Sequence, residues 1–289
     1  MPTVEILDSH IAYVETGRPD RPVVVFLHGS PTSSYIWRNV TPHVADRARV
    51  LAPDLIGMGE SGKPDIDYRF VDHARYLDAW FEALDLREVV IVGHDWGGAL
   101  GMDWAARHPG RVKGIALMET FLRAQSWDEF PPNVVEHMRT LRTPGIGETM
   151  LLRENFAIEG ALPHPFSIQK GLAEKDHDVY RAPFTDPASR RPLLQWPRQI
   201  PIEGEPADVA DRVDAYGQWL ADTPDVPKLL LTVEDGVGIG SPEIAAWAKE
   251  HAASLEVESI GPAGHQAPED QPDAIGQAIA RWLKRHDLT

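Results

Sequence analysis

The stretch VVIVGHDWGGAL, residues 89–100, runs from branched apolar residues into a glycine-rich segment, and this change predicts a strand that turns into a helix. Residues 89–93 are nearly all valine and isoleucine, as in a strand buried on both faces. Gly93 and Gly97 flank the turn and allow the backbone to reverse without clashes between Cβ atoms. The side chain between them, Asp95, is therefore expected to stand at the edge of a sheet.

Similar apolar runs recur along the chain, and helix-period segments separate them. One apolar stripe combines Phe70, Leu77 and Trp80, and another near the C-terminal end combines Ile275 and Trp282. This alternation predicts an α/β fold with a mostly parallel central sheet flanked by helices. The predicted strands are residues 23–27, 48–53, 89–93, 114–118, 228–233 and 255–260.

Residues 131–208 break this alternation, because they hold helical stretches cut by prolines and no convincing strand. We expect a helical cap here, inserted into a core domain formed by residues 1–130 and 209–289. A cap suits this position because ligands of such sheets bind at the carboxyl ends of the strands. An irregular helical segment without a role at the site is the alternative.

The composition excludes several classes of function. A net charge of −16 over 289 residues disfavours nucleic-acid or anionic-membrane partners, and the absence of cysteine excludes disulfides and thiolate catalysis. We find no signal-peptide pattern and no apolar stretch long enough to span a membrane, so a cytoplasmic location is the expectation. No metal cluster or phosphate-binding glycine loop is evident, so no cofactor is expected.

The segment Gly93-His94-Asp95-Trp96-Gly97 fits the G-x-nucleophile-x-G pattern of a nucleophile elbow. In such a turn the backbone N–H of the next residue, Trp96, helps to form an oxyanion hole. An aspartate at the start of a helix can also be a simple N-cap. The strand before it and the Gly/Ala-rich helix after it favour the elbow.

Two further loops supply candidates for the same site. In FLHGSPTSSYIW, residues 26–37, the backbone N–H of Ser30 is the expected second oxyanion donor, although Gly29 and Pro31 also make an ordinary turn. In GPAGHQAPEDQP, residues 261–272, His265 follows the last predicted strand and suits a catalytic base. It is one of 12 histidines, and the chain order nucleophile, acid, histidine distinguishes it.

The acid that would orient His265 has two candidates. Glu119 ends the predicted strand GIALMET, and Asp235 follows KLLLTVED. Both come directly after a strand, and the residue pattern alone leaves both open.

Taken together, these motifs resemble the haloalkane dehalogenases, a branch of the α/β-hydrolase superfamily with a helical cap. The resemblance covers nearly the whole length and is also shared with the related coelenterazine-type luciferases. In the branch with this MET-type segment the acid follows the sixth strand, which implies Glu119 and leaves Asp235 as the alternative. The matching segments are HGSPTSSYIWRN, PDLIGMGESGKP, GHDWGG, RVKGIALMET, SWDEF, APFTDP, PRQIPIEGEP and GHQAPEDQPD.

The resemblance implies a reaction that explains an aspartate at the elbow. A carboxylate displaces halide from a saturated carbon directly, which forms an alkyl ester on Asp95, and His265 then activates a water that releases a primary alcohol. The expected partners are a small halogenated hydrocarbon, water and a halide ion, with the chain a monomer or small homo-oligomer. Trp96 would donate its indole N–H to the halide. The second halide ligand is commonly asparagine in this family, and Ser30 stands there in this chain.

Other functions share parts of this pattern. An epoxide hydrolase also uses aspartate but usually needs two cap tyrosines, and residues 131–208 contain one, Tyr180. A haloacetate dehalogenase would carry arginine at the elbow, where this chain has Trp96. A luciferase-like oxygenase or a non-catalytic ligand receptor stays open on the motifs alone. The residues expected to face the pocket are Trp127, Phe130, Phe156, Trp196 and Pro197.

Overall fold

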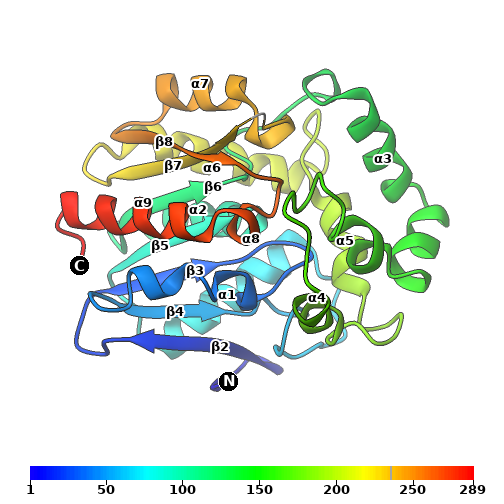
Figure 1. Ribbon diagram of the computed structural model, residues 1–289, viewed down its shortest axis with the longest axis horizontal. Helices are drawn as coiled ribbons and strands as arrows, with labels where there is room; N and C mark the ends of the chain where they lie inside the picture. Colours follow the sequence, from blue (N-terminus) through cyan, green and yellow to red (C-terminus); the bar gives the residue numbers. More distant parts are fainter. Residues whose placement is uncertain (235) are drawn as a thin grey trace.

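The protein is built around an eight-stranded sheet with the order β1-β2-β4-β3-β5-β6-β7-β8 (Figure 1). The computed structural model describes residues 1–234 and 236–289, so the alternative acid Asp235 lies outside the described residues. β2 pairs antiparallel with β1 and β4, and the pairs from β4 through β8 are parallel. The strands are β1 (Thr3–Ile6), β2 (Ser9–Gly17), β3 (Val23–Leu27), β4 (Arg49–Pro53), β5 (Val89–His94), β6 (Val112–Met118), β7 (Lys228–Glu234) and β8 (Leu255–Pro262).

Helices cover both faces of the sheet and bury the alternating strand residues. In β3, Val24 and Phe26 belong to one apolar cluster, whereas Val25 and Leu27 belong to the other. This is the two-faced burial expected of central parallel strands. The helices are α1 (Phe70–Ala83), α2 (Trp96–Arg107), α3 (Pro132–Arg142), α4 (Glu174–Arg181), α5 (Arg191–Gln199), α6 (Ala207–Asp222), α7 (Pro242–His251), α8 (Ala267–Asp270) and α9 (Pro272–Arg285).

The predicted α/β fold with a mostly parallel sheet is confirmed. Each of the six predicted strands overlaps a strand of the structure, with ends that differ by at most two residues. The prediction missed the antiparallel strands β1 and β2. Charged and polar residues such as Glu5, Ser9 and Glu15 interrupt their apolar pattern, because β1 lies at the edge of the sheet and both strands have exposed positions.

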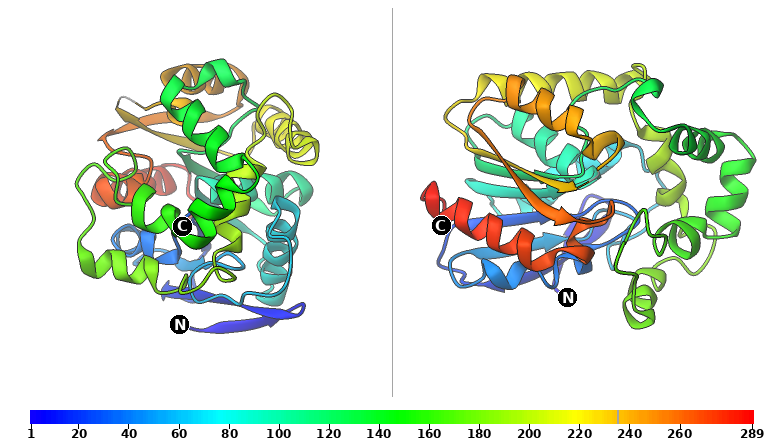
Figure 2. Two further views of the ribbon diagram at one scale, coloured as in Figure 1. Left: turned by 90° about the vertical axis from the view of Figure 1, so that its right-hand side faces the viewer. Right: turned by 45° about the horizontal axis from the view of Figure 1, so that its top comes forward.

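A helical insertion leaves the sheet after β6 and returns before β7. It contains α3, α4 and α5 together with two π-helical turns, η4 (Glu148–Arg153) and η5 (Ala157–Ala161). Figure 1 and both views of Figure 2 place this green insertion over the edge of the sheet at which the parallel strands end. α6 then packs along α2, so the chain is again in contact with the sheet layer there. The exact division at residues 131 and 208 stays a prediction.

Within the part of the chain that the structure describes, no helix has both the length and the apolar character needed to cross a membrane.

Candidate active site

The turn between β5 and α2 holds Asp95 in a backbone conformation that few residues adopt. Asp95 has φ 50° and ψ −126°, and its side chain begins at the tip of the elbow. A Cβ at Gly93 would lie 2.5 Å from the Cα of Gly98, so only glycine permits this approach of strand and helix. The Thr120 hydroxyl donates to the backbone oxygen of Asp95 over 2.7 Å and holds the strained turn.

The two carboxylate oxygens of Asp95 have different surroundings. Oδ2 accepts a hydrogen bond of 2.8 Å from the backbone N–H of Ser30, and the backbone N–H of Trp96 also donates to this carboxylate. Oδ1 lies 3.8 Å from Nε2 of His265. Oδ2 is therefore held by the Ser30 amide, while Oδ1 faces the imidazole.

His265 is connected on its other side to Glu119. Its Nδ1 lies 3.2 Å from Oε2 of Glu119, which is 7% exposed and directly follows β6. Glu119 also has a positive φ, 45°, so both carboxylates of the site occupy unusual backbone positions. The structure thus brings together Asp95, His265 and Glu119, whose catalytic roles stay predictions.

Burial and nearby charges determine the pKa values of Asp95 and His265, whose Oδ1 and Nε2 atoms lie 3.8 Å apart. Burial raises the pKa of Asp95 to about 6, against the lowering effects of His265 and of the two amides. Burial alone would lower the pKa of His265. The hydrogen bond to Glu119 and the negative charges of Asp95 and Glu119 outweigh this effect, so the pKa of His265 is raised.

Two residues that the sequence analysis did not single out support this arrangement. Nε2 of His94 lies 2.8 Å from the backbone oxygen of His265, and burial lowers the pKa of His94 to about 3, so its ring is neutral. The amide nitrogen of Gln266 donates to the backbone oxygen of Ser30 over 3.1 Å. Their positions beside Asp95 and His265 in the sequence were the available signal.

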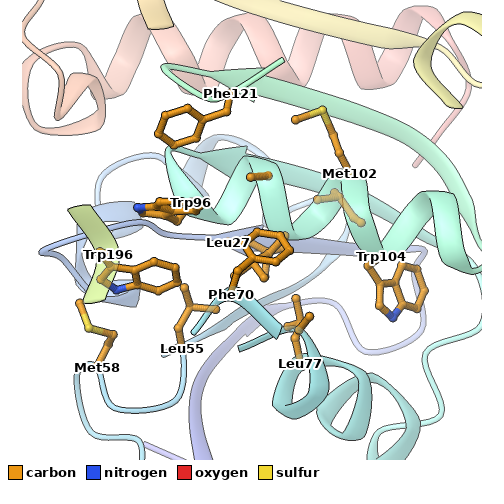
Figure 3. Packing of buried hydrophobic residues seen from close by; sticks show 14 of the residues in the cluster. Leu27, Leu55, Met58, Phe70, Leu77, Trp96, Met102, Trp104, Phe121 and Trp196 are labelled. Carbon is orange, nitrogen blue, oxygen red and sulfur yellow. The ribbon is translucent and has the colours of Figure 1, made fainter. Parts of the chain in front are cut away.

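Trp96 lies in an aromatic cluster at the junction of core and insertion (Figure 3). Its ring packs 4.8 Å from Phe121 and 5.9 Å from Phe70, and it stacks on Trp196 of α5 at 4.8 Å and 27°. Trp196 in turn stacks on His73 at 4.0 Å. These contacts surround the predicted halide donor with apolar surface.

The other residues predicted to face the pocket are distributed more widely. Pro197 is half-buried next to Trp196 in α5, and Phe156 packs 5.4 Å from His137. Trp127 and Phe130 line an open hollow of about 650 Å³ on the side of α3. Neither Asp95 nor Trp96 belongs to the described residues that line it. Of the residues predicted to face the pocket, Trp196 therefore contacts Trp96, whereas Trp127 lines a hollow that neither Asp95 nor Trp96 lines.

A smaller cavity of about 240 Å³ reaches His265. His265 and Glu119 line it, together with Phe166, Val134 and Val237 from the surrounding loops and α3. Its lining combines apolar residues with polar ones such as Asn133 and Gln169.

The insertion holds one tyrosine, and its hydroxyl is engaged by a neighbouring carboxylate. The Tyr180 hydroxyl donates to Glu269, so the single tyrosine of residues 131–208 is already bonded to a carboxylate. Among the described residues, no group of three or more histidine, aspartate or glutamate side chains is placed to hold a metal ion.

Comparisons with known proteins identify the family to which the chain belongs. A family model described as the alpha/beta hydrolase fold matches residues 22–142. A haloalkane dehalogenase of Mesorhizobium japonicum is 50% identical over 97% of this chain and 90% of its own length. The chain belongs to the haloalkane dehalogenase family.

Further members of the family extend the likeness. A haloalkane dehalogenase of Bradyrhizobium diazoefficiens is 45% identical over 96% of this chain and 92% of its own length. The crystal structure of a haloalkane dehalogenase from Bradyrhizobium elkani is 44% identical and superposes with a TM-score of 0.95, covering 99% of this chain and 98% of that one. Family membership therefore rests on the full length, including the insertion.

Proposed function

We propose that this chain hydrolyses the carbon–halogen bond of small haloalkanes through an alkyl ester on Asp95, with His265 as base and Glu119 as its partner. The proposal rests on the different surroundings of the two Asp95 carboxylate oxygens. Oδ2 accepts a hydrogen bond of 2.8 Å from the Ser30 amide, and Oδ1 faces Nε2 of His265 at 3.8 Å. A carboxylate held in this way has one free oxygen with which to attack.

In the first step Oδ1 attacks the carbon that bears the halogen. A carbon–oxygen bond forms, the carbon–halogen bond breaks with its electron pair, and halide leaves. The indole N–H of Trp96 donates to this halide in apolar surroundings, where an unpaired anion is strongly disfavoured. The Ser30 hydroxyl is the second donor that we propose.

In the second step water attacks the carbonyl carbon of the ester. His265 takes one proton from this water, and the ester carbon–oxygen bond breaks with its electron pair. The alkoxide takes the other proton of the added water and leaves as the alcohol, Asp95 is again a carboxylate, and the proton on His265 passes to the solvent. The negative charge of Asp95 is one of the causes that raise the pKa of His265. The ester removes that charge, so the imidazole loses its proton more readily when it must act as base.

The charges that develop in this second step have partners already in place. The amides of Ser30 and Trp96, which face the carboxylate of the free enzyme, would stabilise the oxyanion, an effect of about 3 kcal/mol per donor in other enzymes. Glu119 at 3.2 Å would stabilise the imidazolium.

We further propose that residues 131–208 form the cap domain over a core of residues 1–130 and 209–289. Trp196 and Pro197 would then form the cap side of the substrate pocket, because Trp196 stacks directly on Trp96. Phe130, Phe156 and Trp127 would act further out, on the cap surface and its approaches. An aromatic pocket of this kind favours an uncharged, apolar substrate.

Halide release from chlorinated, brominated and iodinated alkanes tests the proposal. Asp95→Ala should abolish release, and Asp103→Asn, a buried carboxylate that pairs with Arg107 and Arg212 instead, should keep it. His265→Phe should release about one halide per chain and then stop, with the alkyl group found on Asp95 by mass spectrometry. Turnover that survives Asp95→Ala would refute the proposed nucleophile.

A further inference from the structure

The loop that carries His265 is bonded to the insertion through its backbone. The N–H of His265 donates to the backbone oxygen of Phe166 over 3.0 Å, and the N–H of Gln266 donates to that of Ser167 over 2.8 Å. Residues 166–170, here called the clamp segment, therefore lie directly along the histidine loop. The first of these contacts is made by the backbone of His265 itself, whose imidazole must meet the attacking water.

A buried carboxylate, Asp270, fastens the same two pieces of chain. Its side chain is fully buried, and it accepts hydrogen bonds from the backbone N–H of Gly264 at 2.8 Å, Gln169 at 2.9 Å and Lys170 at 2.8 Å. The first donor precedes His265, and the other two belong to the clamp segment. One carboxylate thus joins the histidine loop to the insertion.

The histidine loop and the clamp segment are packed so closely at Gly264 that no side chain fits between them. A Cβ at Gly264 would lie 2.5 Å from the backbone oxygen of Ser167 and 2.8 Å from that of Phe166. Both obstacles are backbone atoms, so they cannot turn aside as a flexible side chain would. The position of His265 is therefore tied to that of the clamp segment.

We propose that Asp270 is a positioning residue for ester hydrolysis, which holds His265 in register with Asp95 by fastening the histidine loop to the clamp segment. The inference rests on the proposed function, because it assumes that His265 acts only in the second step. Alkylation of Asp95 needs no proton transfer, so it does not depend on this junction. Loosening the junction should slow hydrolysis and spare alkylation.

The two steps can be measured separately by rapid quenching and intact-protein mass spectrometry with a brominated alkane. Asp270→Asn places an amide N–H₂ against backbone donors, and Gly264→Ala pushes the clamp segment away without a change of charge. We expect each variant to lower the rate of ester hydrolysis between about 10-fold and 100-fold, a loss typical of misplacing a catalytic group by about 1 Å. The alkylation rate should change less than about twofold, so alkylated enzyme accumulates.

Asp103→Asn is the matched control for loss of a buried carboxylate, and it should change neither step. Equal loss of both steps in Asp270→Asn and Gly264→Ala would show a merely structural role and overturn the proposal, as would wild-type hydrolysis in both variants. If Asp270→Asn does not fold, Gly264→Ala alone decides between these outcomes. His265→Phe separates the two levels of argument, because failure to trap any ester there would refute the proposed function itself.

Discussion

Asp95 should reduce the stability of the folded protein at neutral pH. Its pKa is raised to about 6 by burial, against 3.8 for an ordinary aspartate. This difference corresponds to about 3 kcal/mol. Below pH 3.8 the carboxyl is protonated in both the folded and the unfolded chain, so the cost is absent. Between 3.8 and about 6 the folded chain binds more protons than the unfolded one, so stability falls as pH rises, and above about 6 the full cost is present.

Asp95→Asn removes the charge while keeping an oxygen for the amides of Ser30 and Trp96. We expect the free energy of unfolding of this variant to exceed that of the wild type by about 3 kcal/mol more at pH 8 than at pH 4. Urea unfolding at both pH values measures the difference. The dependence of the unfolding free energy on urea concentration must have the same slope in both proteins for the comparison to report stability alone.

The charge of His265 also affects the pKa of Asp95. Comparing proteins with and without Asp95→Asn that also carry His265→Phe removes this effect. The sign should persist there, since burial is the largest cause of the raised pKa and His265 acts against it. A difference between variant and wild type that is the same at pH 4 and pH 8 would refute the reasoning, because it would show that Asp95 titrates normally in the folded protein.

Three further results should follow. The value of kcat/KM, which reports the free enzyme, should rise with pH through about 6 as Asp95 ionises, and a flat profile from pH 5 to 7 would contradict this in a rate series on one brominated alkane. Glu119→Gln should lower ester hydrolysis by roughly 10³- to 10⁴-fold, as charge removal does in related triads, and leave alkylated Asp95 detectable by mass spectrometry; undiminished turnover would exclude Glu119 as the acid. Ser30→Asn should speed alkylation by up to about 100-fold if the longer amide is a better halide donor than a hydroxyl, and stopped-flow halide release that is no faster would show that Ser30 already suffices.

The strands and the elbow could be predicted because their signals are local. Near-continuous valine and isoleucine in residues 89–93, followed by glycines, define a buried strand and a tight turn within a dozen residues. β2 was missed because it lacks this local signal: its exposed positions carry polar residues, which interrupt the apolar run. Local pattern thus recovered the buried centre of the sheet better than its edge.

The site depends on contacts between distant residues. His265 and Glu119 lie 146 positions apart in the chain and 3.2 Å apart in space, and the residue pattern offered Asp235 equally. The hydrogen bond of Gln266 to Ser30 and the three amides on Asp270 involve backbone atoms, which leave little trace in residue type. Trp196 could be predicted to face the site from its position in the expected cap, but its stacking on Trp96 depends on the three-dimensional packing.

That stacked pair of indoles makes the contact between α2 and α5 visible to light. Trp96 belongs to one helix and Trp196 to the other, with ring centres 4.8 Å apart and planes inclined by 27°. The excited states of two indoles this close are coupled. Because their planes are held at a fixed inclination, the coupling gives a pair of circular dichroism bands of opposite sign. A displacement of α5 weakens those bands as the rings separate. The circular dichroism of this pair therefore reports the position of α5 relative to α2 without an attached dye, and Trp196→Phe is the control that removes the signal.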